Sequence, residues 1–337
     1  MTVPDTRDLV LDTLLRTDDI ELRHRVRAEV VASINRALPG LSCLAPTDDR
    51  KALAALLHHD GIQPAGRTDP ALCEGILRHI SQMPLFNSYS AASSDGVARL
   101  PDQARKFPIG AVPTQEVCRT PGVVEIANDP NVLKIVECYL GCIPTIYSIG
   151  IWHSFPCENY NITQTFHRDY DDFRFCSLFV YLTDVDEQSG PHQYVKQSHT
   201  LDGVRDILAR WASRRASNAG GADLPATVPE FYFQMRFTEK YNVGGAFHRS
   251  FAGLFGDQVV DVMGPAGTSF LADIYGLHRG LHPRGKPRTI LNVRYGIGAG
   301  SFGPRHGHAV PHIDPETFRS RLPSSPTVEY INRNFLR

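Results

Sequence analysis

The sequence predicts a mainly β fold, a sandwich or barrel of antiparallel strands with helices packed outside it. Three observations lead to this prediction. From about residue 143, short segments rich in β-branched and aromatic residues follow one another, and Gly, Pro and Asp turns separate them. The helical patterns lie before residue 143 and in one insert. With 337 residues, the chain is long enough for one large domain or two modest ones.

Three stretches before residue 143 have the pattern of helices. Residues 6–37 place apolar side chains at three- and four-residue steps and end at a Pro-Gly pair. Residues 69–83 and 128–141 each contain an Asp-Pro pair that suits an N-cap and a first helical turn. Gly141 can close the third helix in a left-handed conformation. These helices are expected to pack outside the strands.

The candidate strands have the β-branched and aromatic composition of half-buried or buried sheets. They lie within residues 143–155, 175–185, 190–197, 258–276 and 288–298. We expect residues 1–40 to be an N-terminal helical segment and residues 41–320 to be a single domain with its β core at about 143–298. Residues 321–337 are expected to be a C-terminal tail.

An insert at about 200–247 separates two of the candidate strands. Its first half reads as a basic helix, and a later Ser-Asn-Ala-Gly-Gly-Ala-Asp run is flexible by composition. Long excursions from a compact β core are often lids or binding loops. The insert is therefore a candidate cover for a substrate, with aromatic side chains to contact it at Trp211, Phe231, Tyr232 and Phe233.

The composition argues against several classes of partner. Lys plus Arg number 35 against 36 Asp plus Glu, so the net charge of −1 gives no reason to expect nucleic acid or an acidic membrane surface. Seven scattered cysteines fit reduced thiols of a cytosolic protein better than a disulfide framework. Acidic residues occur too early for a secretory signal, and no apolar run is long enough to span a membrane. We expect a cytoplasmic protein.

The segment Gln-Thr-Phe-His-Arg-Asp at 164–169 holds the first candidate metal ligands. Side chains at positions i and i+2 of a strand point to the same face, so His167 and Asp169 lie side by side while Arg168 faces away. One imidazole and one carboxylate, together with a second imidazole, make the facial triad of metal ligands in non-haem Fe(II) oxygenases. Such a pair also occurs by chance at protein surfaces, so the prediction needs a third ligand.

A third ligand and an anion-binding cation follow downstream. Residues 268–278 read as one strand with His278 at its end, and Arg288 opens the next strand ten residues later. Adjacent antiparallel strands bring such residues close together. The planar guanidinium of Arg288 can hold a carboxylate in a bidentate fashion, and a buried Arg without an anion would be costly.

The sequence resembles the phytanoyl-CoA dioxygenase family of Fe(II)- and 2-oxoglutarate-dependent oxygenases. The resemblance rests on Gln-Thr-Phe-His-Arg-Asp, on Phe-Val-Tyr-Leu-Thr-Asp-Val-Asp-Glu-Gln-Ser-Gly-Pro-His-Gln-Tyr-Val-Lys-Gln-Ser-His, and on Asp-Ile-Tyr-Gly-Leu-His-Arg-Gly followed by Pro-Arg. It spans roughly residues 143–298. The resemblance implies a double-stranded β-helix, or jelly roll, related to the cupins, with surrounding N-terminal and inserted helices.

The same resemblance implies a site. His167, Asp169 and His278 would be the iron ligands, and Arg288 would hold the distal carboxylate of 2-oxoglutarate. Family members often have Ser or Thr two residues after the distal His, where this chain has Gly280. Gln164 is our candidate for the second contact to 2-oxoglutarate.

Other residues compete for these roles. His282 is an alternative to His278 as the third metal ligand, although it lies in a turn directly before a proline. Arg284, Lys286 and Arg294 are alternatives to Arg288 as the cation that binds the carboxylate. The histidines at 192 and 199 fit better as turn-stabilising or hydrogen-bonding residues. The remaining candidates for substrate contact are His153, His248, His306, His308 and His312.

The resemblance implies a dioxygenase that uses Fe(II), 2-oxoglutarate and O₂ to hydroxylate an unactivated C–H bond of a small molecule in a biosynthetic pathway. The carboxylate of Asp169 favours hydroxylation over halogenation, because halogenating relatives have a small residue there. The same site also permits desaturation, cyclisation or epimerisation. A different class, a non-catalytic jelly-roll binding protein, stays open at this stage. The sequence carries no signal of oligomeric state.

Overall fold

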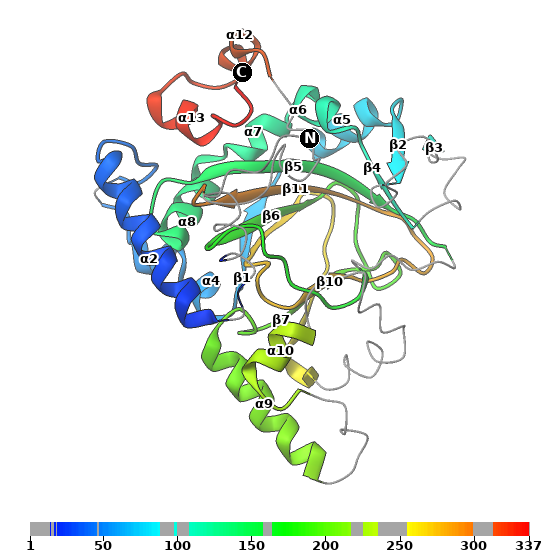
Figure 1. The fold of residues 1–337 in the computed structure, drawn as a ribbon. Coiled ribbons are helices and arrows are strands. Elements are labelled where there is room, and N and C mark those ends of the chain that lie inside the picture. Colours follow the sequence, from blue (N-terminus) through cyan, green and yellow to red (C-terminus); the bar gives the residue numbers. More distant parts are fainter. Residues whose placement is uncertain are drawn as a thin grey trace, which may run out of the picture.

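The computed structural model describes residues 14, 17, 19–45, 47–87, 98–99, 108–157, 164–216, 225–234, 255–298 and 313–336. Within these residues the strands form two antiparallel sheets, which face each other in Figure 1. The main sheet has the order β1-β9-β6-β11-β5-β4-β2-β3, and the smaller one has the order β10-β7-β8. The strands are β1 Ile62–Arg67, β2 Pro84–Asn87, β3 Ala98–Arg99, β4 Ile109–Ala111, β5 Thr145–Ser154, β6 Phe175–Tyr181, β7 His192–Val195, β8 Val259–Val262, β9 Thr268–Ala272, β10 His278–Gly280 and β11 Arg288–Gly296.

The strand order is that of a double-stranded β-helix. From β6 on, the chain passes back and forth between the sheets: β6, β9 and β11 lie in the main sheet, β7 and β8 together in the smaller sheet between β6 and β9, and β10 in the smaller sheet between β9 and β11. The smaller sheet is extended by one isolated antiparallel bridge, in which His167 pairs with His278 of β10. The predicted mainly β, jelly-roll fold is therefore confirmed.

Helices cover the outer face of the main sheet (Figure 1). They are α2 Ile20–Ala37, α3 Arg50–Leu53, α4 Ala55–His59, α5 Pro70–Ile80, α6 Thr114–Arg119, α7 Val123–Ala127 and α8 Pro130–Leu140. The predicted caps of two of them are present. Asp69 accepts a hydrogen bond from the backbone of Ala71, and Asp129 accepts one from Asn131. Gly141 ends α8 with a φ of 84°.

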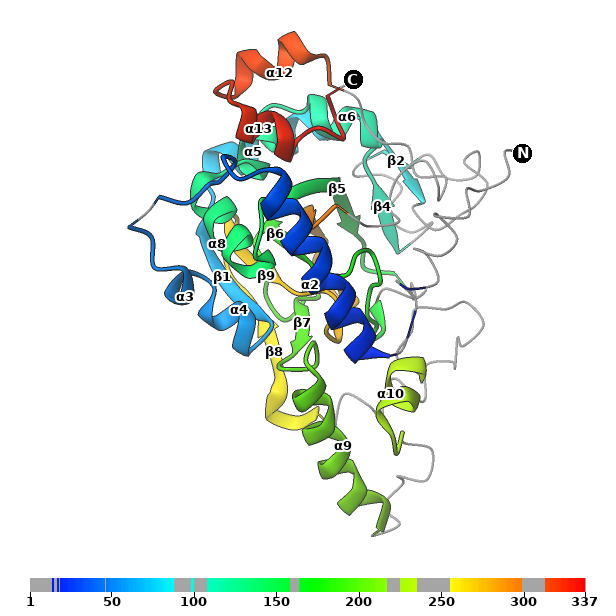
Figure 2. The same ribbon diagram turned by 60° about the vertical axis from the view of Figure 1, so that its left-hand side comes forward.

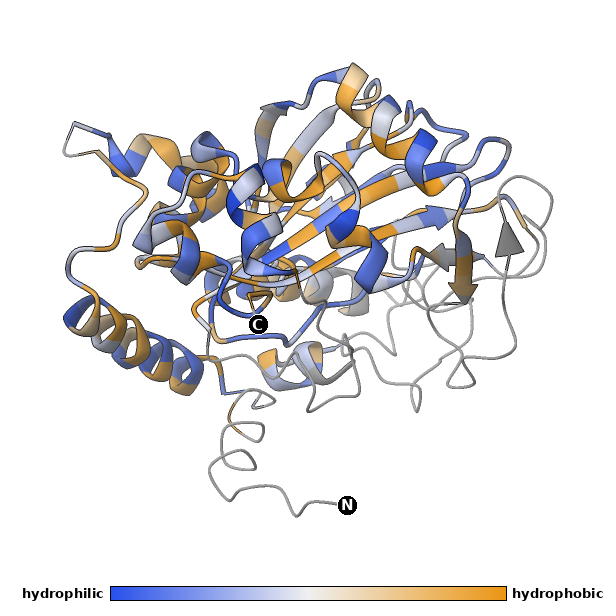
Figure 3. Ribbon diagram, turned by 90° about the horizontal axis from the view of Figure 1, so that it is seen from above, coloured by the Kyte–Doolittle hydropathy of each residue, from blue (hydrophilic) through white to orange (hydrophobic). Residues whose placement is uncertain are grey.

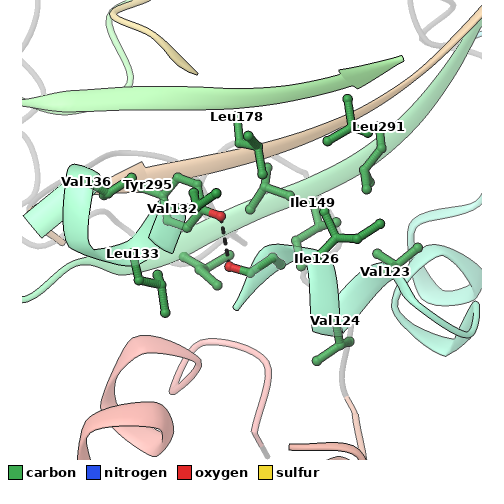
Figure 4. Packing of buried hydrophobic residues seen from close by; sticks show 14 of the residues in the cluster. Val123, Val124, Ile126, Val132, Leu133, Val136, Ile149, Leu178, Leu291 and Tyr295 are labelled. Carbon is green, nitrogen blue, oxygen red and sulfur yellow. Dashed lines mark hydrogen bonds between the residues drawn. The ribbon is translucent and has the colours of Figure 1, made fainter. Parts of the chain in front are cut away.

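A first core lies between these helices and the main sheet. Figure 4 shows α7 and α8 packing apolar side chains against Ile149, Leu178 and Leu291, which come from three neighbouring strands. The hydroxyl of Tyr295 donates a hydrogen bond of 2.8 Å to the carbonyl of Ala127, which fixes α7 to β11. Figure 3 shows hydrophobic residues gathered along the strands and on the helix faces that cover them.

A second core fills the space between the two sheets and extends to the insert. Phe179 and Phe270 stack across β6 and β9 with ring centroids 5.1 Å apart. In the insert, α9 Leu201–Ala216 and α10 Val228–Gln234 lie below the smaller sheet in Figure 2. Trp211, Phe231 and Tyr232 belong to this second core and are buried. Residues 235–247 of the insert and the side chain of Phe233 lie outside the described residues.

Two expectations about the strands are wrong. The strands are not limited to the expected core at about 143–298, because β1 pairs with β9 and β4 pairs with β5. β1 contains Pro64 and Gly66, so its composition does not indicate a strand, but Pro is tolerated at the edge of a sheet. The predicted strand 268–278 is also two elements, because β9 ends at Ala272 and a turn leads to β10 in the other sheet.

The C-terminal residues pack on the domain. The last helices are α12 Pro315–Arg321 and α13 Pro326–Ile331. Ile331 and Phe335 are buried in the first core, so the segment 321–337 contributes to the folded domain. None of the helices in the described residues is both long and apolar enough to cross a bilayer.

Candidate active site

A local pair of side chains and a third from a distant part of the sequence converge between the two sheets. His167, Asp169 and His278 each place one ligand atom within 4.8 Å of the other two. His167 Nε2 lies 3.9 Å from Asp169 Oδ1, and the two imidazole centroids are 4.3 Å apart. Both histidines are buried, whereas the carboxylate is partly open to solvent. Two imidazoles and one carboxylate thus surround a single point.

Backbone hydrogen bonds hold the three residues together. The N–H of His167 donates to the carbonyl of His278, and the N–H of His278 donates back, both at 3.0 Å. The N–H of Asp169 donates to the carbonyl of Ile274 at 2.9 Å. Each ligand candidate is thus held in place through its own backbone.

The histidine rings are oriented for metal binding through Nε2. Nδ1 of His167 lies 2.8 Å from the carbonyl of Thr165, and Nδ1 of His278 lies 3.0 Å from the carbonyl of Gly276. A carbonyl only accepts, so Nδ1 carries the proton and the lone pair of the ring is on Nε2. Burial lowers the pKa of His167 and holds the pKa of His278 well below its usual value. Both rings are therefore neutral at pH 7, as metal ligands must be.

The second oxygen of Asp169 is held by Arg294 of β11. One Nη of Arg294 lies 3.3 Å from Asp169 Oδ2, and the other contacts the buried carboxylate of Asp171. Burial opposes the charge of Arg294, but the carboxylates of Asp171 and Asp169 outweigh burial and raise its pKa. Arg294 thus positions Asp169, with Oδ1 turned toward His167.

Replacing Arg294 by Met should weaken metal affinity about 10- to 100-fold, because outer partners of metal ligands contribute that much. Titration calorimetry with Mn(II) measures the change. The variant should also carry Asp171→Asn, so that no buried carboxylate is left without its cation. Arg174→Met, which removes a half-buried guanidinium elsewhere, is the control. Unchanged affinity in the Arg294 variant would exclude this positioning role.

Arg168 faces away from the trio, as the alternation of side chains predicts. Its guanidinium lies between the rings of Tyr232 and Tyr275, 3.8 and 3.7 Å from their centroids. It also donates to the carbonyl of Tyr275 at 3.0 Å. Since Tyr232 belongs to α10, this stack joins the insert to the segment that carries two of the candidate ligands.

Arg288 lies at the start of β11 on the same sheet face as Arg294, and it is buried. One Nη donates to the hydroxyl of Ser154 at 3.3 Å. Its Nε and second Nη are buried and make no hydrogen bond to any residue that the structure describes. Burial lowers the pKa of Arg288. A buried guanidinium with two unused donors is suited to bind an anion.

The competing residues are engaged elsewhere. His282 contacts the backbone of Cys157, and Lys286 forms an exposed ion pair with Asp186. Arg284 is exposed.

The other candidates lie as follows. His153 forms a hydrogen bond of 2.6 Å with the hydroxyl of Thr289. Gln164 is buried at the start of the segment that leads to His167. His199 lies 3.2 Å from the carbonyl of His58, in keeping with a hydrogen-bonding role. The candidates at 248, 306, 308 and 312 lie outside the described residues.

His192 is a residue of this site that the sequence does not reveal. It was expected to stabilise a turn, but it begins β7, and its ring stacks on His278 with an interplanar angle of 19°. The only signal that could have found it is the pairing of β7 with β10, which places His192 opposite Gly280.

Comparisons with known proteins give no family by sequence and a distant likeness by structure. No protein-family model and no curated protein matches the chain. AviO1 from Streptomyces viridochromogenes Tue57 is 14% identical with a TM-score of 0.42, covering 76% of this chain and 98% of that one. The epimerase SnoN in complex with Fe³⁺, α-ketoglutarate and nogalamycin RO is 15% identical, with a TM-score of 0.44 and 76% and 86% covered. HygX from Streptomyces hygroscopicus with nickel, 2-oxoglutarate and hygromycin B is 12% identical, with a TM-score of 0.44 and 73% and 86% covered.

Proposed function

We propose that this protein is an Fe(II)- and 2-oxoglutarate-dependent dioxygenase that hydroxylates a small molecule. The observation that carries the proposal is the His167, Asp169 and His278 trio together with the buried, under-bonded guanidinium of Arg288. Two imidazoles and one carboxylate are the ligand set of non-haem Fe(II) oxygenases. HygX and SnoN were also crystallised with a metal ion and 2-oxoglutarate, but a likeness this distant adds no weight.

The residues of the site fit both the iron ion and 2-oxoglutarate. His167, Asp169 and His278 would hold the iron through two neutral imidazole nitrogens and one carboxylate oxygen. Arg288 would bind the distal carboxylate of 2-oxoglutarate, which satisfies its two unused donors. Bound iron and 2-oxoglutarate supply the oxidising chemistry with O₂, and the protein supplies position and the exclusion of water. Gln164 is our proposed further contact to 2-oxoglutarate.

The face of β5 beside the trio is our proposed substrate surface. Ser148, Gly150 and Trp152 are half-buried, while the residues between them are buried. Alternate residues of a strand share a face, so these three lie on the same side as Ser154, which contacts Arg288. Trp152 also lies 5.9 Å from the guanidinium of Arg294. A half-open aromatic beside the metal site suits a small organic molecule, with the insert as its cover.

Production of succinate from 2-oxoglutarate tests the proposal. We expect purified protein to release succinate when Fe(II) and O₂ are present, with a rise when a member of a natural-product, amino-acid or sugar library fits the site. Product analysis by mass spectrometry then separates hydroxylation, a gain of one oxygen, from desaturation or cyclisation, a loss of two hydrogens, and from epimerisation. Binding of iron and 2-oxoglutarate without any turnover would favour the non-catalytic binding protein.

A further inference from the structure

His192 lies beside His278 and makes no contact that explains why it is a histidine. The residue is 4% exposed, and its ring stacks on that of His278 with centroids 5.7 Å apart. On its other sides it contacts the aromatic rings of Phe179 and Phe270, at 4.7 and 5.2 Å. These aromatic rings pack around the imidazole, and neither carries a nitrogen or oxygen atom that could form a hydrogen bond with it.

The Nε2 atom of His192 has an unused hydrogen-bonding capacity. It is buried and has no hydrogen-bond partner among the described residues. A buried polar atom without a partner costs free energy, and in a native protein such an atom calls for an explanation. An apolar side chain of similar size would pack between Phe179 and Phe270 without that cost. A ligand that accepts a hydrogen bond from Nε2 supplies the explanation.

Arg288 lies on the other side of this position. His192 is directly opposite Gly280 in the pairing of β7 with β10. A Cβ atom at Gly280 would lie only 2.5 Å from an Nη of Arg288, so the missing side chain lets the guanidinium approach the strand. The ring of His192 therefore lies between a candidate iron ligand and the candidate anion site.

We propose that His192 donates a hydrogen bond from Nε2 to the distal carboxylate of 2-oxoglutarate, beside Arg288. The inference rests on the proposed function. In the family that the sequence resembles, a hydroxyl two residues after the distal His is common, and here that position is Gly280. His192 would bring its Nε2–H to the same position from the neighbouring strand β7. This N–H would take the role that the hydroxyl has in the family. Two unsatisfied groups, Nε2 of His192 and the guanidinium of Arg288, then share one carboxylate.

Calorimetric titration of Mn(II)-loaded protein under anaerobic conditions tests this. His192→Leu should bind 2-oxoglutarate about 10- to 100-fold more weakly, the loss of one hydrogen bond to a charged group, while Mn(II) affinity is unchanged. His192→Gln, which keeps an N–H donor, should recover most of the affinity. His199→Leu is the matched control, because it removes another buried imidazole with an unpaired nitrogen, outside the site. Equal affinity for 2-oxoglutarate in His192→Leu and wild type would overturn the inference.

Pyruvate distinguishes a contact with the distal carboxylate of 2-oxoglutarate from a contact with its chelating end, because pyruvate has the chelating end but no distal carboxylate. His192→Leu should bind pyruvate as the wild type does, and an equal loss for both acids would exclude a contact with the distal carboxylate. Wild-type protein that binds no 2-oxoglutarate would contradict the proposed function itself.

If His192→Leu does not fold, nitrogen NMR of Zn(II)-loaded wild type tests the same contact. The His192 Nε2 resonance should shift when 2-oxoglutarate is added, and an unchanged resonance would exclude the bond.

Discussion

Replacing Asp169 by Ala should abolish iron-dependent succinate production and leave the fold intact. The carboxylate supplies the single oxygen donor of the trio, with Oδ1 3.9 Å from Nε2 of His167. Loss of an outer partner alone weakens metal affinity about 10- to 100-fold, so loss of the ligand should cost at least about 100-fold. Arg294 keeps its ion pair with Asp171, which limits the structural damage. Metal affinity is measured by calorimetry and turnover by succinate release.

Two further variants sharpen this test. Asp202→Ala removes an exposed carboxylate on α9, whose side chain is 90% exposed, and should change neither quantity. His167→Ala should match Asp169→Ala in losing turnover, since it removes a second ligand of the same ion. Wild-type succinate production in either ligand variant would show that the metal is bound elsewhere.

Replacing Arg288 by Met should have opposite effects on binding and on stability. The guanidinium would form more than one charge-assisted hydrogen bond to 2-oxoglutarate, each contributing about 1.5–3 kcal/mol, so affinity should fall at least about 100-fold. Without 2-oxoglutarate, two nitrogens of Arg288 are buried and unpaired among the described residues. Burying a charge without a partner is costly, so Met should raise the free energy of unfolding by about 1–3 kcal/mol. Urea denaturation measures that gain.

Arg288→Lys is the matched control for the guanidinium. It keeps the positive charge but loses the planar fork, so it should bind 2-oxoglutarate with an affinity between those of wild type and Arg288→Met. If Arg288→Met instead lowers stability and leaves the affinity for 2-oxoglutarate unchanged, Arg288 is a structural residue and the anion site is wrong.

Local signals made much of the fold predictable. Asp69 and Asp129 cap α5 and α8 through hydrogen bonds within three residues, so the sequence alone contains both partners. The strands of the core have the composition that buried sheets require. The pair His167 and Asp169 is likewise local, because alternate side chains of an extended segment share a face whether or not the segment forms a regular strand.

What could not be predicted depends on pairing between distant segments. β1 has no strand composition and is defined by its pairing with β9, some two hundred residues later. His192 lies in a strand of four residues, too short for any periodicity to show. The partnership of Arg294 with Asp169 and Asp171 requires the register of β11 beside the loop after Asp169. Each of these facts is a property of the folded sheets.

A crystal structure of the protein loaded with Fe(II) and 2-oxoglutarate under anaerobic conditions tests the central claim most directly. The account predicts one iron ion bound by Nε2 of His167, an oxygen of Asp169 and Nε2 of His278, with the distal carboxylate of 2-oxoglutarate against Arg288. Iron bound by other side chains, or 2-oxoglutarate bound away from Arg288, would contradict it.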